Sequence, residues 1–201
     1  MEFPCGVFME LKKYPIEKSN IVINNTIDSS MSLDIIKDIN AYQYEYNKVF
    51  DENNLVLETV GLPKMEYKPS LQVHLNTFGG CAYNGFAIYD RINKFEHSTV
   101  ICQGAVMSCG ILILLSGKER LAYPNTTFMI HGIRSGAFGK LPEMKEDVKE
   151  TERLQGMYKR VILENTNILQ EKLEEVFEKQ QNWYIDTKEA LELGLIHKII
   201  E

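Results

Sequence analysis

The sequence predicts an α/β fold. Short runs rich in β-branched residues alternate with segments whose apolar residues recur at helical spacing, and turn-forming residues separate the two kinds of segment. The chain has 201 residues, of which 44% are hydrophobic and 25% are charged, values typical of a globular protein. Because no internal repeat or low-complexity tract interrupts this pattern, we expect one domain spanning residues 1–201.

The first predicted strand is the β-branched run at residues 21–23, and a helix follows it after a turn-rich segment. Ser30 or Ser32 is the candidate N-cap of this helix, because a serine hydroxyl can accept a hydrogen bond from the first turn. The helix is expected to run to about Phe50 on the strength of apolar residues at helical spacing (Leu33, Ile36, Ile39, Tyr42 or Tyr46, and Val49). Residues 51–69 show no period and contain Gly61, Pro63 and Pro69, so we expect an exposed insertion with at most one irregular strand.

Three further strands are predicted in the middle of the chain, at residues 71–75, 99–103 and 128–130. The first of them ends at the turn 76–80, and a helix follows to about Phe95. An apolar helix separates the other two, and the strand–turn–helix pattern places Ser108 at its N-terminus.

The last third of the sequence is predicted to be mostly helical. Pro142 suits the first turn of a helix, and a long charged helix continues from it to about Asn165. A short helix is expected at residues 169–179. Asp186 and Glu189 have capping-box spacing at the start of a last helix that ends at Gly194, and residues 195–200 then form a strand.

Charge and hydropathy exclude two classes of partner. The formal net charge of −6, without a Lys/Arg cluster, disfavours nucleic acid. The longest apolar run, residues 111–115, is far too short to cross a membrane. We also expect no secretion signal, because a basic segment followed by an apolar one is missing at the N-terminus.

The cysteines and histidines indicate neither a zinc site nor a disulfide framework. The four cysteines (Cys5, Cys81, Cys102 and Cys109) form no C-x-x-C pair, and the four histidines are dispersed. We therefore expect reduced thiols, a cytoplasmic protein, and no metal or cofactor.

Ser108 and His131 are the candidates for nucleophilic chemistry. At the start of a helix, unpaired N–H groups and the positive end of the helix dipole favour developing negative charge near Ser108. A hydroxyl there with an imidazole in reach is a candidate acyl-transfer pair. The adjacent thiol of Cys109 is an alternative nucleophile, but one helical position further on a side chain points about 100° away.

The tetrahedral intermediate of acyl transfer also needs hydrogen-bond donors for its oxyanion. Gly79-Gly80 lies at a predicted strand end, where only glycine lets the backbone approach a substrate closely. The amides of Gly80 and Cys109 are the candidate donors. Taken singly, each feature has an ordinary structural explanation: a turn for the glycines, a helix cap for Ser108 and a core or surface position for His131.

Together, these segments resemble the ClpP family, the proteolytic subunits of Clp proteases. Four motifs carry the resemblance in the family's order (Leu75-Asn-Thr-Phe-Gly-Gly80 with Ile88-Tyr-Asp90, Gly104-Ala-Val-Met-Ser-Cys-Gly110, Pro124-Asn-Thr-Thr-Phe-Met-Ile-His131, and Glu189-Ala-Leu-Glu-Leu-Gly-Leu195). The similarity covers residues 71–200, and a weaker similarity extends over residues 21–50.

The resemblance implies a crotonase-like fold of stacked β-β-α turns with a protruding handle, here about residues 132–165. It implies a serine peptidase with Ser108 as nucleophile, His131 as base, and the amides of Gly80 and Cys109 as oxyanion hole. It also implies that an extended substrate peptide lies beside the segment Ser135, Gly136, Ala137, Phe138 and Gly139, where main-chain pairing gives affinity without demanding a sequence.

The family further implies a homo-oligomer of two stacked heptameric rings, a tetradecamer, with the handle helix meshing the rings. Its substrates are unfolded polypeptides fed by a partner ATPase of the AAA+ unfoldase class. The present sequence lacks a G-x-x-x-x-G-K-[ST] phosphate loop, so the peptidase core itself is expected to be ATP-independent.

The third catalytic position departs from the family pattern. Counting back from Glu189 without gaps, the family's aspartate falls on Asn182, whose amide carbonyl can orient the imidazole but supplies no negative charge. Asp186 is the nearest downstream carboxylate, although it suits a helix cap, and Glu178 is the nearest upstream one. Gly132-Ile133 also replaces the family's usual Gln/Asn-Pro. The first twenty residues and the 51–69 insertion match no family pattern, so no docking residue can be assigned.

Two other functions fit the same residues. A catalytically weak ring subunit with a scaffolding or regulatory role is favoured by Asn182. An acyl-CoA enzyme of the crotonase-like fold also uses paired backbone amides, but it has no need for Ser108 together with His131.

Overall fold

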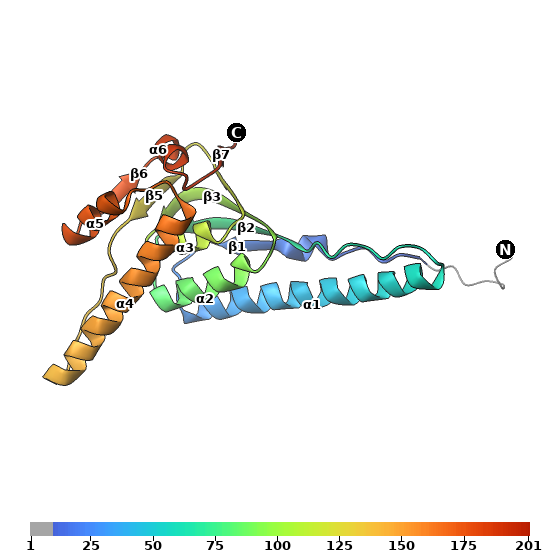
Figure 1. Ribbon diagram of the computed structural model, residues 1–201, viewed down its shortest axis with the longest axis horizontal. Coiled ribbons are helices and arrows are strands. Elements are labelled where there is room, and N and C mark those ends of the chain that lie inside the picture. Colours follow the sequence, from blue (N-terminus) through green and yellow to red (C-terminus); the bar gives the residue numbers. More distant parts are fainter. Residues whose placement is uncertain (1–9) are drawn as a thin grey trace.

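The computed structural model describes residues 10–201 and shows a seven-stranded sheet flanked by helices (Figure 1). The strands are β1 (Asn20–Ile23), β2 (Ser70–Thr77), β3 (His97–Met107), β4 (Glu119–Ala122), β5 (Thr127–Ile130), β6 (Trp183–Ile185) and β7 (Lys198–Ile199). The helices are the 3₁₀-helix η1 (Ile16–Ser19), α1 (Ser29–Thr59), α2 (Ala82–Asn93), α3 (Gly110–Leu115), α4 (Leu141–Asn165), α5 (Gln170–Glu178) and α6 (Thr187–Glu192). The predicted α/β class is confirmed.

The sheet divides along β3. Its strand order is β1-β2-β3-β4-β7 with every pair parallel, while β5 pairs with β3 and, antiparallel, with β6. The first half of β3 pairs with β4 and its last three residues with β5. Gly104 marks the division with a left-handed φ of +63°, and the Ala105 N–H there donates to Asn76 Oδ1 at 3.0 Å. The end of β3 thus enters a small layer formed with β5 and β6.

Helix α1 is longer than its sequence pattern predicts. Its N-cap is Asp28, whose carboxylate accepts a hydrogen bond from Met31 N at 2.8 Å, so neither Ser30 nor Ser32 is the cap. The buried face consists of Ser32, Ile35, Ile39, Tyr42 and Tyr46, whereas Leu33 is 52% exposed. The helix runs nine residues beyond Phe50 because side chains of its second half are buried by other segments.

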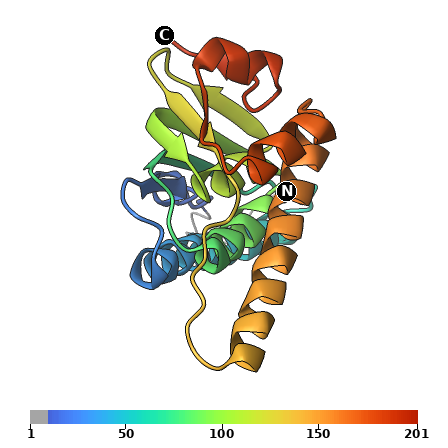
Figure 2. The ribbon, with the colours of Figure 1, turned by 90° about the vertical axis from the view of Figure 1, so that its left-hand side faces the viewer.

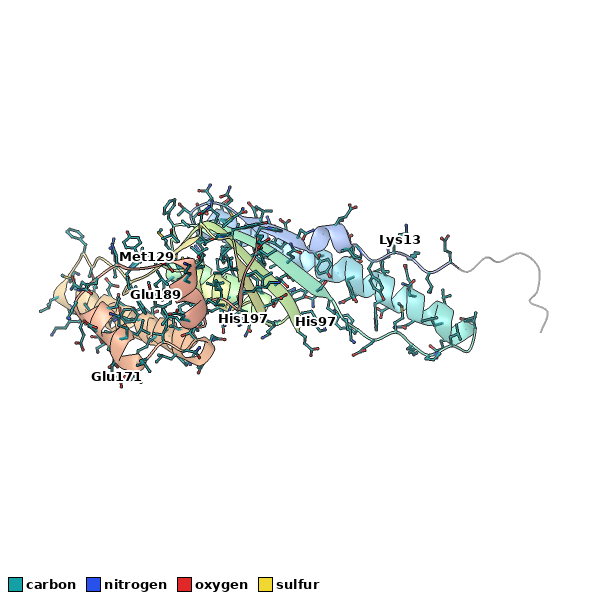
Figure 3. All side chains as sticks on the ribbon, turned by 90° about the horizontal axis from the view of Figure 1, so that it is seen from above. Lys13, His97, Met129, Glu171, Glu189 and His197 are labelled. Atoms are coloured by element: carbon teal, nitrogen blue, oxygen red, sulfur yellow. The ribbon has the colours of Figure 1, made fainter. Side chains whose placement is uncertain are left out.

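Residues 51–69 are helical at 51–59, where irregular structure was expected, and exposed and irregular at 60–68, as expected; together they form part of an arm. Asn53 is 2% exposed and exchanges two hydrogen bonds with the main chain of Lys12, and Asn54 Oδ1 accepts one from Met65 N. Three segments therefore build the arm: residues 10–19, the second half of α1, and residues 61–69, as Figure 1 shows at the N-terminal end of the molecule. Figure 3 shows Lys13 on this arm, at the opposite end of the long axis from Met129 and Glu189.

Other boundaries also differ from prediction. Strand β3 is longer than 99–103, strand β7 is shorter than 195–200, and β4 and β6 were not predicted at all. β4 gave little apolar signal because it contains the buried Arg120, whose guanidinium donates to Asn165 O and Gly194 O at 2.9 Å each. These two bonds tie the C-terminal ends of α4 and α6 to the sheet.

Helix α3 lies at the centre of the core, and all six of its residues are buried. A helix that is apolar on every side must be covered on every side. It packs against β2, β3 and β5 and against helices α2 and α4. The turn that precedes α3 is thereby held between the sheet and both helices.

Helix α4 and the segment before it project from the body of the molecule. Figure 2 shows residues 132–140 running beside α4 and turning back into it at the far tip. Pro142 stands in the first turn of this helix, as predicted, and the helix ends at Asn165. Between residues 10 and 201, no helix is both long and apolar enough to span a lipid bilayer.

Candidate active site

Ser108 lies in a strained turn between β3 and α3. Its φ is +55°, the left-handed region that non-glycine residues rarely occupy, and this conformation costs about 1–3 kcal/mol. Helix α3 begins only at Gly110 with Cys109 as its N-cap, so Ser108 precedes the helix rather than capping it. Its amide donates to Met129 O of the neighbouring strand at 2.9 Å. The turn holds the serine beside the end of β5.

The glycine pair is placed against this turn by the backbone. A Cβ on Gly79, where φ is +98°, would lie 2.6 Å from Ser108 Cβ, so only glycine fits. Gly80 is held by a bridge in which Ile27 N donates to Gly79 O at 2.9 Å and Cys81 N donates to Ile27 O at 2.8 Å. This bridge leaves the N–H of Gly80 itself unused.

Two amides remain without an oxygen or nitrogen acceptor. Within residues 10–201, neither the Gly80 N–H nor the Cys109 N–H donates a hydrogen bond to a protein oxygen or nitrogen, although both interact with the Cys109 thiol and lower its pKa against the larger effect of burial. Both residues line one cavity of about 530 Å³ together with Ser108 and His131. The two residues expected to donate to an oxyanion therefore line the same cavity as the serine and the imidazole.

His131 follows the last residue of β5. Its Nδ1 is 2.5 Å from the carbonyl oxygen of Gly132, and within the described chain no hydrogen bond joins it to Ser108. Burial, and secondarily the charge of Arg134, lower the pKa of His131, while the Gly132 carbonyl acts in the opposite direction. The imidazole is therefore neutral at neutral pH, as a general base must be.

Asn182 lies across from His131. The antiparallel ladder pairs Phe128 with Ile185 and Ile130 with Trp183, and continuing it by one residue sets position 131 opposite position 182. The Asn182 amide oxygen accepts a hydrogen bond from Arg134 Nη2 at 2.9 Å instead of one from His131. Strand register thus sets Asn182 next to His131 along the backbone, but its side chain is bound to Arg134, and Asn182 is not among the described residues that line the cavity shared by Ser108 and His131.

The alternative carboxylates are differently placed. Asp186 caps α6, with its carboxylate accepting hydrogen bonds from Lys188 N and Glu189 N at 2.9 Å each. The predicted capping box is only half formed, because the Glu189 carboxylate accepts from Trp183 Nε1. Glu178 is an exposed residue at the end of α5. Neither makes a hydrogen bond to His131.

The expected substrate segment follows His131 away from the body. Ser135 and Gly136 line the cavity, whereas Ala137, Phe138 and Gly139 lie beyond its lining. None of these residues is in a strand, and the Phe138 side chain is fully exposed. Their main-chain groups face no partner strand within the described chain.

The cavity has an apolar wall and a polar rim. The wall includes Phe86 of α2, Leu112 of α3 and Leu154 of α4. At the rim, Tyr83 Oη donates to Glu150 at 2.6 Å, and Arg153 donates to the same carboxylate through two nitrogens, which lowers the pKa of Glu150 to about 2. This bridge joins α2 to α4 over the site.

Four residues of the site have no sequence signal that we recognised: Tyr83, Arg134, Glu150 and Tyr158. Each reaches the cavity from an element distant in sequence or from an irregular segment, so no spacing identifies it.

The thiol of Cys109, the alternative nucleophile, is poorly placed for that role. Burial raises the pKa of this thiol to about 12, which makes it a poor nucleophile beside Ser108. Among residues 10–201 no cluster of His, Cys, Asp and Glu side chains could hold a metal ion.

One cavity is thus lined by a serine, an imidazole and two glycine- or turn-borne backbone amides, which are the groups that a serine hydrolase site requires. The model of the Clp protease family matches residues 13–201 of the chain. The ATP-dependent Clp protease proteolytic subunit of Deinococcus radiodurans is 30% identical over 152 residues, which are 74% of each chain. An Asn-to-Asp mutant of ClpP1 from Listeria monocytogenes has a similar solved structure, with a TM-score of 0.70, 24% identity, and coverage of 92% of this chain and 93% of that one.

The chain belongs to the Clp protease family. The resemblance drawn from the four motifs is confirmed, and so is the ClpP-like, crotonase-like fold expected from it.

Proposed function

We propose that this chain is a serine-type endopeptidase core that cleaves unfolded polypeptides inside an oligomeric ring. The observation that carries the proposal is the shared cavity, which is lined by Ser108, His131, Gly80 and Cys109. The curated relative is a proteolytic subunit, which supports the same reaction. The three described cysteines are free, in line with a cytoplasmic location.

The reaction follows from the roles of these groups. Ser108 Oγ attacks the scissile carbonyl, and His131 accepts the hydroxyl proton and returns it to the leaving amine. The Gly80 and Cys109 amides stabilise the oxyanion, each contributing roughly 3 kcal/mol to the transition state. Water then hydrolyses the acyl-enzyme with His131 again as base. For proton transfer His131 Nε2 must come within hydrogen-bond distance of Ser108 Oγ, since no hydrogen bond joins these two side chains in the described chain.

Asn182 is the third catalytic residue in this proposal. Its position opposite His131 supports the assignment over Asp186, which is engaged as a helix cap. An amide oxygen can accept the Nδ1–H and fix the tautomer, but it does not stabilise the imidazolium by charge. We therefore expect slower turnover than an aspartate would give.

The substrate is expected to lie along residues 135–139. These residues have unpaired main-chain groups next to the cavity, so an extended peptide can add to them as a strand. Main-chain pairing binds many sequences, which suits a peptidase that takes unfolded chains. A separate AAA+ unfoldase would supply such chains.

Helix α4 is the proposed handle between two stacked heptameric rings. Its first half carries exposed apolar side chains at helical spacing, with Leu141 66%, Met144 37% and Val148 53% exposed. Such a stripe on a projecting helix is typical of a surface that another subunit covers.

A catalytically weak ring subunit is the second candidate. The observation that favours it is the pair of competing hydrogen bonds: His131 is bound to Gly132 O, and Asn182 to Arg134. Both must be exchanged before the three side chains can act together.

A fluorophosphonate probe tests the proposal. The probe phosphonylates only an activated serine, so the wild-type chain should be labelled at Ser108. Ser108→Ala should remove the label, and His131→Ala should abolish it because the base is lost. Ser30→Ala, on the exposed start of α1, is the matched control and should label like wild type.

Hydrolysis of an unfolded, fluorescently tagged protein separates the two candidates. Labelling together with hydrolysis supports the endopeptidase. Labelling with negligible hydrolysis supports the weak subunit, and a wild-type chain that stays unlabelled even with an unfoldase contradicts the enzymatic assignment.

A further inference from the structure

The carbonyl group of Ser108 is held from two sides. It accepts hydrogen bonds from Ile111 N at 3.0 Å and from Tyr158 Oη at 3.1 Å. The first donor belongs to the turn itself, and the second comes from α4, fifty residues further along the chain. Tyr158 is therefore the side chain that ties the strained serine turn to the projecting helix.

The same peptide group carries the proposed oxyanion donor. The Ser108 carbonyl and the Cys109 N–H belong to one peptide unit, and in a trans peptide they point in opposite directions. The described residues contain no cis peptide bond. Fixing the carbonyl oxygen toward Tyr158 and Ile111 consequently fixes the direction of the Cys109 N–H.

Tyr158 is a rigid donor. Its side chain is 3% exposed, and its ring stacks on Phe177 of α5 with centroids 6.1 Å apart and planes 18° from parallel. Burial raises the pKa of its phenol, which favours the protonated hydroxyl that can donate. A hydrogen bond donated to the carbonyl also polarises the peptide and strengthens its N–H as a donor.

We propose that Tyr158 is a positioning residue, whose hydroxyl orients the Ser108–Cys109 peptide so that the Cys109 N–H meets the oxyanion. This inference rests on the proposed peptidase function. Tyr158 acts through the peptide and takes no part in proton transfer. Its effect should therefore appear in the transition state and not in substrate binding.

The kinetic test is Tyr158→Phe, which removes one oxygen atom and keeps the ring stack. We expect kcat to fall about tenfold with KM within about twofold of wild type. Affinity for a peptidyl boronic acid, whose tetrahedral adduct places an oxygen in the oxyanion hole, should also fall about tenfold. Tyr42→Phe is the matched control, because Tyr42 is as buried as Tyr158 but lies on α1, away from the cavity. Loss of the Tyr42 hydroxyl should leave kcat, KM and the boronate affinity unchanged.

A spectroscopic test does not depend on activity. Ser108-Cys109 is the only Ser-Cys pair in the sequence, so a chain labelled with ¹³C-carbonyl serine and ¹⁵N cysteine gives one cross-peak in a carbonyl–amide correlation spectrum. Tyr158→Phe should shift this cross-peak, because the carbonyl loses a hydrogen bond while the ring stays in place. Tyr42→Phe should leave it unmoved.

The outcomes separate this inference from the proposed function. If wild type is labelled and active while Tyr158→Phe keeps its kcat and boronate affinity, the inference is wrong and the peptidase assignment stands. A rise in KM at constant kcat would likewise overturn it, because the ring would then serve substrate packing. If wild type is inert, the function fails, and an unmoved cross-peak would show that Tyr158 does not position the peptide either.

Discussion

Single residues fix the chemistry of the site through close contacts. Gly79 leaves room for Ser108, and the left-handed φ of Ser108 persists because three hydrogen bonds hold its main chain. In contrast, His131 is bound to the Gly132 carbonyl and Asn182 to Arg134, and these hydrogen bonds compete with the one proposed between His131 and Asn182. In the proposed function, the backbone of the oxyanion hole is therefore preorganised, whereas the proposed proton-transfer residues must still rearrange.

The pH dependence of activity tests the pair at positions 131 and 182. Because burial and the Arg134 charge lower the pKa of His131, wild-type activity should rise with pH to a plateau with its midpoint below 6.5. Asn182→Asp places a negative charge opposite the imidazole, which favours the protonated form and moves the midpoint to higher pH. On the plateau we expect kcat to rise at least tenfold, because the imidazolium is now stabilised.

Asp186→Asn, four residues after position 182, is the matched exchange for this prediction. It should leave the midpoint where it is in wild type. A midpoint unchanged in Asn182→Asp, with the shift seen in Asp186→Asn instead, would show that Asn182 is not the partner of His131. pH–rate profiles of peptide hydrolysis measure both.

Residue spacing predicted Ser108 and His131 because their motifs lie in continuous segments. Gly80 and Cys109 follow from the same segments, and the structure places all four at one cavity. Tyr158 and Arg134 were not predictable, because their partners are tens of residues away in sequence and only the packing of α4 and the 132–140 segment brings them close.

At the level of elements, N-cap residues determine where the helices begin. Asp28 and Asp186 start α1 and α6 by accepting N–H groups of the first turn. The Asp186 cap was visible in the sequence, since aspartate, an acidic third residue and an apolar run followed each other. The Asp28 cap was missed because Ser30 and Ser32, two and four residues further on, offered the same chemistry.

Replacing the α6 cap distinguishes a structural from a catalytic Asp186. Asp186→Ala should lower the free energy of unfolding by about 1 kcal/mol, because two N–H groups lose their acceptor. Fluorophosphonate labelling of the folded protein should remain at the wild-type rate. Asp28→Ala, at the corresponding place in α1, is the control for cap loss. Abolished labelling in folded Asp186→Ala alone would instead identify Asp186 as the third catalytic residue.

The element boundaries that sequence periodicity misplaced have physical causes. The helix over residues 51–59 lacks a simple apolar stripe, because Asn53 and Asn54 are buried by hydrogen bonds to the other arm segments. Strands β4 and β6 have four and three residues, and two of these are the buried Arg120 and the exposed Tyr184. Their pairing partners, rather than their own pattern, make them strands.

At the scale of the whole molecule, the arm and α4 project from opposite ends of a compact body (Figure 1). Of these two projections, only α4 adjoins the cavity, which Leu154 and Tyr158 on its second half help to line. Its first half carries the exposed apolar stripe. A contact between subunits at the tip of α4 would therefore be transmitted along one helix to the serine turn.

Charge placed in that stripe should disrupt the proposed contact between rings. For the double variant Met144→Glu with Val148→Glu, we expect the particle of about fourteen subunits to fall to about seven, because burying the two carboxylates is costly. Size-exclusion chromatography with light scattering measures this. Leu191→Glu, at a 42% exposed position on α6, is the control and should leave the mass unchanged. A wild-type monomer would contradict the ring proposal itself.

Ser108 and His131 follow the last residues of β3 and β5, Asn182 precedes the first residue of β6, and β5 pairs with both of the other strands. The backbone positions of these three residues are consequently set by strand pairing and do not depend on which atoms terminate the side chains. A single codon change at position 182 could therefore raise or lower the catalytic power of the chain without altering its scaffold, so that loss and recovery of activity lie one mutational step apart.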